Sequence, residues 1–106
     1  MTEIEFFKDS SEKLTGFHVY GHTGFAYTGE DIVCAAISSA VIMVMNTVTD
    51  VMQIDADASA EDGDAVMKIS SENAGACQSI LQGLKLHLLE LEKQYGDFIN
   101  IKFTEV

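Results

Sequence analysis

The stretch EDIVCAAISSAVIMVMNTV, residues 30–48, decides the fold of this chain. From Ile32 to Val48 it has no charged side chain, and at about 17 residues it is at the short end of the length that crosses a bilayer. Acidic residues stand on both sides of it, whereas a membrane-spanning helix usually has basic anchors on one side. We therefore expect no membrane span, but a helix buried on most of its faces inside a domain or a dimer.

Patterns typical of strands surround this helix on both sides. Short apolar or alternating runs predict five strands, over residues 3–8, 14–20, 54–58, 65–70 and 98–104. The acidic run at residues 61–64 predicts a hairpin turn, and apolar residues at helical spacing predict a second helix over residues 74–95. The order β-β-α-β-β-α-β predicts an α+β fold for residues 1–106: one two-layer domain with a mostly antiparallel sheet and two helices on one face.

The charge balance excludes one large class of partners. The chain has 106 residues, of which 17 are acidic and six are lysines, for a formal net charge of −11. A protein that binds nucleic acid needs a basic face, so we expect no direct nucleic-acid contact. The negative field attracts basic polypeptides; the alternative is that it only keeps the domain soluble.

The N-terminal residues 1–8 do not have the basic and apolar regions of a secretory signal. We therefore expect a cytoplasmic protein whose thiols are reduced. Under these conditions Cys34 and Cys77 are each judged as a packing residue or a reactive one, not as a disulfide.

Cys34 is the first candidate for chemistry, because it stands near the start of the predicted helix. Thr28 and Asp31 are both candidate N-caps, and under either assignment the thiol falls in the first or second turn, where the helix dipole favours a thiolate. The preceding glycine-bearing segment contains His22, whose imidazole can take the thiol proton and return it to a leaving amine. From local spacing alone, a buried structural cysteine and a loop histidine without a role remain the alternative.

Two further residues lie within a helical turn of Cys34. Asp31 is three residues before it and Ser38 is four after it, so all three can share one side of the helix. We expect Asp31 to orient His22 and Ser38 to bond near the thiol or the substrate. An ordinary N-cap and a serine bonded to its own helix are the alternatives.

The other histidines and the second cysteine suggest no further site. In a strand, His18 and His22 would be roughly 13 Å apart, too far to share a small metal ion. His87 is expected on the surface of the second helix or packed within it, and Cys77 lies on the apolar stripe of that helix. We expect no metal and no cofactor.

With these residues in place, the pattern resembles a known family. The segments GHTG at residues 21–24 and GEDIVCAAIS at residues 29–38 closely resemble the signature of the ribosomal-processing cysteine protease (Prp) family, with His22 and Cys34 twelve residues apart. The runs LQGL at residues 81–84 and EKQY at residues 92–95 extend the resemblance to essentially the whole chain.

The resemblance implies a cytoplasmic, homodimeric endopeptidase. Members remove the N-terminal extension of the bacterial large-subunit ribosomal protein twenty-seven, cutting beside an apolar stretch that contains aromatic residues. The resemblance places the catalytic roles on Cys34 and His22 and supporting roles on Asp31 and Ser38. The chain departs from the family pattern at Thr23, where alanine is more usual, and at Gly96, where proline is expected.

The segment between the two catalytic positions is expected to be a flexible loop that contacts the substrate. Its glycines suggest motion, and its two aromatic residues are candidate walls of a recognition pocket or, equally, core residues; the residues concerned are Gly21, Gly24, Phe25, Tyr27 and Gly29. The rival from another class is a non-catalytic acidic dimeric binding module associated with ribosomal proteins. A redox sensor is a weaker rival, because no C-x-x-C motif is present.

Overall fold

The structure is a computed structural model that describes residues 1–21, 28–61 and 63–106, with the backbone alone for residues 28–31. Its elements follow one another along the chain as β1 (Thr2–Lys8), β2 (Leu14–Tyr20), α1 (Thr28–Asn46), a π-helical turn (Thr47–Val51), β3 (Asp57–Glu61), β4 (Asp64–Lys68), α2 (Ser71–Ala74), a 3-10 turn (Gly75–Cys77), α3 (Gln78–Gln94) and β5 (Ile99–Glu105).

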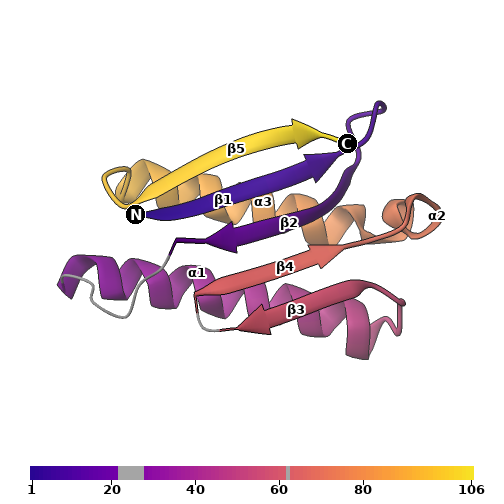
Figure 1. The fold of residues 1–106 in the computed structure, drawn as a ribbon, viewed down its shortest axis with the longest axis horizontal. Coiled ribbons are helices and arrows are strands. Elements are labelled where there is room, and N and C mark those ends of the chain that lie inside the picture. Colours follow the sequence, from indigo (N-terminus) through magenta and orange to yellow (C-terminus); the bar gives the residue numbers. More distant parts are fainter. Residues whose placement is uncertain (22–27, 62) are drawn as a thin grey trace.

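The five strands form one sheet in the order β3-β4-β2-β1-β5. Only β1 and β5 run parallel among these neighbours, and the other three pairs are antiparallel. A parallel pair needs a crossover, and α3 supplies it by carrying the chain from β4, across the sheet, to the edge beside β1. Figure 1 shows α1 and α3 on the same face of the sheet. The predicted two-layer α+β architecture is therefore confirmed.

The core lies between the sheet and the two long helices. Alternation along the central strands turns Ile4, Phe6 and Phe17 toward the helices, and all three are fully buried. Each long helix adds a buried stripe at helical spacing, which consists of Val33, Ile37, Val41 and Val44 in α1 and Leu81, Leu84 and Leu88 in α3. Burial of these side chains is the main favourable term that holds the two layers together.

The long apolar helix is less enclosed than its sequence suggested. Residues Ile32–Val51 are long and apolar enough to cross a membrane by length and composition alone, a test that the core helix of a compact domain also passes. Its inner side belongs to the core, whereas Ile42, Met43 and Val51 are exposed. Within one protomer the helix is thus buried on one side rather than on most faces.

Gly16 lets two neighbouring strands approach closely. A Cβ atom at this position would lie 2.2 Å from the carbonyl oxygen of Met67 on β4. Gly16 also lies beside the irregularity in the pairing of β1 with β2, which falls between Phe7 and Lys8. Any side chain at Gly16 would force β2 and β4 apart.

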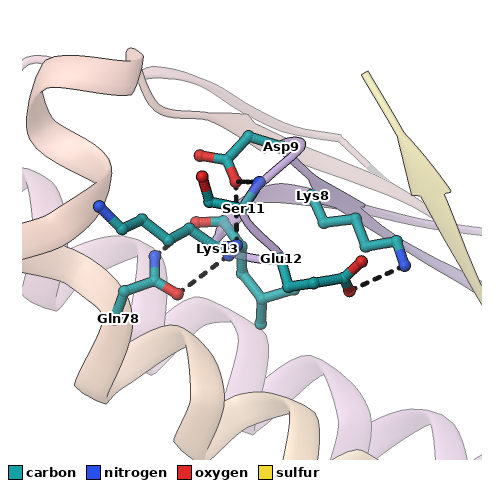
Figure 2. Close-up of polar contacts among 7 residues, drawn as sticks. Lys8, Asp9, Ser11, Glu12, Lys13 and Gln78 are labelled. Atoms are coloured by element: carbon teal, nitrogen blue, oxygen red, sulfur yellow. Dashed lines mark hydrogen bonds and ion pairs between the residues drawn. The ribbon is translucent and has the colours of Figure 1, made fainter.

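The end of the sheet opposite the N-terminus is fixed by side-chain hydrogen bonds (Figure 2). In the turn after β1, the carboxylate of Asp9 accepts the backbone N–H groups of Ser11 and Lys13 at 2.8 and 3.0 Å. At the start of α3, the amide of Gln78 accepts the N–H of Leu14 at 2.9 Å and donates to its carbonyl at 2.7 Å. These contacts join the beginning of α3 to the beginning of β2.

Two predicted boundaries are wrong. The strand expected over residues 54–58 begins only at Asp57, because the chain after the π-helical turn still packs on the helix: the Ile54 N–H donates to the carbonyl of Val48 at 3.0 Å, and Ile54 itself lies against the core. The helix expected over residues 74–95 is interrupted by the 3-10 turn that ends at Cys77, although its apolar spacing continues.

Candidate active site

The candidate site lies at one end of the sheet, where β1 begins, β2 ends and the chain turns between β3 and β4 (Figure 1). A cavity of about 270 Å³ opens there between the sheet and α1. Its lining combines an apolar floor with polar groups at its rim, and consists of Thr2, Val19, Tyr20, Cys34, Ile37, Ser38, Val41, Ile42, Ala60, Glu61, Gly63, Asp64 and Ala65. The predicted Cys34 and Ser38 are thus brought to one cavity.

Cys34 lies in the second turn of α1, because the helix begins at Thr28. Its neighbours Val33 and Ile37 are buried in the core, which fixes the orientation of this part of the helix. The Cys34 side chain is only 5% exposed, and its sulfur lies 3.4 Å from the hydroxyl oxygen of Thr2. The thiol is therefore held at the inner wall of the cavity and not on the open surface.

The supporting positions divide into one that the structure describes fully and one that it does not. Ser38 is exposed and lies one turn after Cys34 on the same side of α1, as predicted from the spacing. The Asp31 backbone lies in the first turn of α1, and its side chain is outside the described part. Neither candidate cap precedes the helix, since Thr28 and Asp31 both belong to its first turn.

The predicted loop falls mostly outside the described residues, which include neither His22 nor Gly24, Phe25 and Tyr27. Gly21 is described: it directly follows β2 with φ of +89°, and a Cβ there would come within 3.0 Å of the Met1 carbonyl oxygen. Gly29 was expected in the loop but belongs to α1, so this assignment is wrong. The helix starts at Thr28, two residues earlier than expected.

The end of the sheet beside the cavity carries an acidic rim, made of Glu61 at the end of β3 and Asp64 at the start of β4. The Asp64 carboxylate lies 2.7 Å from the imidazole of His18, whose ring stacks on Tyr20 with 4.4 Å between ring centroids. Because Phe17 and Val19 of β2 face the helices, alternation places these side chains on the opposite face of the sheet from α1. The rim therefore adds to the negative field at this end of the sheet without facing Cys34.

The remaining candidates for a second site are histidine, cysteine and acidic residues. Among the side chains that the structure describes, no group of three or more histidine, cysteine or acidic residues could hold a metal ion. His87 is exposed on α3. Cys77 is fully buried, and this burial raises the pKa of its thiol, so it is a packing residue.

Sequence reasoning missed Thr2, the acidic rim and Tyr20 as parts of the site. A signal for Thr2 was present, since it shares the alternation of Ile4 and Phe6 and therefore points to the helix side of β1. The contribution of Glu61 and Asp64 depends on how β4 pairs with β2, which the sequence does not specify.

Solved structures of other proteins share this fold. Two crystal structures of the S. aureus ribosomal processing protease Prp are similar to the chain: the complex with a substrate peptide has a TM-score of 0.88 at 23% identity, and the complex with a covalently linked product peptide has 0.84 at 24% identity. In both cases the match covers 98% of this chain and 100% of that chain.

A Streptococcus mutans protein is also similar, with a TM-score of 0.82 at 21% identity over 100% of this chain and 96% of that chain. At these identities the structures support the fold alone. The curated proteins include no significant match.

Family membership depends on the sequence itself. Residues 1–100 match the family described as cysteine protease Prp. The match spans nearly the whole chain, confirms the resemblance seen in the two motifs, and sets aside the non-catalytic binding module. The chain belongs to the Prp family of cysteine proteases.

Proposed function

We propose that this cysteine protease removes the N-terminal extension of the large-subunit ribosomal protein twenty-seven, with Cys34 as the nucleophile and His22 as the general base and acid. The observation that carries the proposal is the position of Cys34: it stands near the start of α1 and lines a cavity whose other walls suit a peptide. The family match over residues 1–100 supports the same chemistry.

The reaction is an acyl transfer in two steps. His22 takes the proton of the Cys34 thiol, the thiolate attacks the scissile carbonyl, and the leaving amine departs with the proton returned by the imidazole. A thioester then joins the acyl part of the substrate to Cys34. Water, activated by the same imidazole, hydrolyses the thioester and restores the free thiol. Asp31 and Ser38 have supporting roles, in orienting the imidazole and in bonding near the thiol.

The cavity suits the proposed substrate in two respects. Its floor is apolar, with Val19, Ile37 and Val41 among its residues, and this matches an apolar recognition stretch. Its rim carries Glu61 and Asp64 on a chain of net charge −11, which attracts a basic ribosomal protein and speeds the encounter. The S. aureus Prp structure that resembles this chain was determined with a substrate peptide bound, which fits a peptide-binding role.

The decisive experiment offers the purified extended ribosomal protein to three variants. We expect the parent to cleave it at one position and Cys34→Ala to reduce the rate by at least about 10³-fold, because the nucleophile is lost. Cys77→Ala is the matched control, since it removes the other buried thiol, and it should retain most of the turnover. Mass spectrometry of the products measures the cut. Equal cleavage by the parent and Cys34→Ala would refute the assignment of the nucleophile.

We also propose that the enzyme works as a cytoplasmic homodimer, with a second copy on the outer face of the helices. A groove of about 580 Å³ between α1 and α3 has apolar walls that include Met43 and Ile80, and Ile32 and Leu86 are exposed nearby on the same two helices. An apolar surface of this kind is typical of a protein interface.

We expect the parent to sediment as a dimer and Met43→Glu to shift it to the monomer. A monomeric parent at micromolar concentration would refute the proposal.

A further inference from the structure

Among the side chains that the structure describes, Thr2 is the only polar one that is buried. It is 2% exposed and points to the helix side of β1, in line with Ile4 and Phe6. A valine would fill this position with nearly the same shape and without a polar atom. A buried hydroxyl lowers stability unless it is hydrogen-bonded. The Thr2 hydroxyl is therefore expected to have a hydrogen-bond partner.

The partner is the thiol of the proposed nucleophile. The Thr2 Oγ1 atom lies 3.4 Å from the Cys34 sulfur, and both residues line the same cavity. The threonine is rigidly held, because its N–H donates to the carbonyl of Phe98 at 2.8 Å and its strand pairs with β2 on one side and β5 on the other. The hydroxyl therefore approaches the sulfur from a fixed backbone position at the start of β1.

We propose that Thr2 is a positioning residue for Cys34, whose hydroxyl donates a hydrogen bond to the thiolate and thereby orients and stabilises the nucleophile. The inference depends on the proposed role of Cys34 and adds the group that supports it from the sheet. A neutral thiol can donate or accept in this contact, but a thiolate has no proton and can only accept. Ionisation thus turns the contact into a charge-assisted bond, which is stronger than a neutral one.

The surroundings of the sulfur make this donor important. The cavity wall beside Cys34 is apolar and includes Val19, Ile37 and Val41, and an apolar environment opposes a negative charge. The titratable groups that border the cavity, Tyr20, Glu61 and Asp64, belong to the end of the sheet, where Asp64 contacts His18 on the opposite face. At 5% exposure, most of the Cys34 side chain contacts protein instead of solvent. A hydroxyl fixed within the protein replaces the hydrogen bond that water would otherwise give to the anion.

The test compares Thr2→Val, which removes the hydroxyl and keeps the shape, with Thr2→Ser, which keeps the hydroxyl. The rate of iodoacetamide alkylation at Cys34 is measured against pH by peptide mapping, and kcat and KM are measured on a cleavable peptide. For Thr2→Val we expect the midpoint of the alkylation profile to rise by about one pH unit and kcat to fall about 10-fold, with KM nearly unchanged. Thr2→Ser should stay within about threefold of the parent.

Two controls separate positioning from a general loss of structure. Thr104→Val removes another strand hydroxyl, one that bonds to Glu5 and lies away from the cavity, and it should leave the profile in place. Thermal unfolding of each variant reports any change in stability. The inference is overturned if Thr2→Val alters the melting temperature alone and leaves the alkylation profile and kcat at the parent values.

The outcome also distinguishes this inference from the proposed function. If Cys34→Ala is inactive while Thr2→Val behaves as the parent, Cys34 is the nucleophile and Thr2 only fills the core. If Cys34→Ala still cleaves, the proposed function itself fails, whatever the alkylation profile of Thr2→Val shows.

Discussion

The two cysteines of this chain are alike in burial but differ in their surroundings. Both are buried and unpaired, at 5% exposure for Cys34 and 0% for Cys77. Cys77 ends the 3-10 turn before α3 and faces the core, where burial raises the pKa of its thiol. Cys34 lines a cavity and contacts the hydroxyl of Thr2. The fraction buried does not distinguish the two thiols, whereas the cavity and the polar neighbour of Cys34 do, and the proposed role of Cys34 as the nucleophile depends on these two features.

The alkylation rates of Cys34 and Cys77 test this comparison, and the difference between them is the largest of the expected effects. At neutral pH we expect iodoacetamide to modify Cys34 at least about 100-fold faster than Cys77 in the folded protein, because Cys34 lines a cavity that a small reagent can enter, whereas Cys77 is fully buried. Mass spectrometry of digested samples gives both rates from one reaction. In denaturant the two rates should converge, which serves as the internal control. Equal rates in the folded state would place Cys34 in the packing class with Cys77.

Sequence patterns predicted the features that depend on local periodicity. The strands over 3–8 and 14–20 and the long helix follow from alternation and helical spacing, and the structure agrees within two residues. Cys34 was expected in the first or second turn of that helix and lies in the second. The four-residue spacing predicted that Cys34 and Ser38 share one side of the helix, and both line the cavity.

Features that depend on tertiary pairing could not be predicted in the same way. Thr2 reaches Cys34 across 32 positions of sequence, and this contact exists only because the start of β1 packs against the second turn of α1. The acidic rim depends likewise on β4 pairing with β2. Ile54 looked like part of a strand because it is apolar, but its side chain packs on the core from the segment that follows the helix.

The pH dependence of the free energy of unfolding tests the other half of the comparison, the buried Cys77 thiol. It is the smallest of the expected effects. Burial raises the pKa of this thiol above the value of 9.0 that it has in the unfolded chain. Below pH 9 the thiol is protonated in both states, so its contribution is complete. Above pH 9 the unfolded chain releases the proton while the folded protein keeps it, and the free energy of unfolding therefore falls as the pH rises.

Denaturant unfolding of the parent and of Cys77→Ala at several pH values measures this contribution. Between pH 8 and pH 10 the parent should lose more stability than the variant, by no more than the limit of about 1.4 kcal/mol per pH unit for one proton. The variant has a lower stability throughout, because a core side chain is shortened, but only the difference in slope carries the test. Tyrosines and lysines titrate alike in both proteins and cancel from that difference. If the free energy of unfolding fell with pH equally in the parent and in Cys77→Ala, the folded protein would tolerate the Cys77 thiolate. Burial in the core would then not raise the pKa of this thiol.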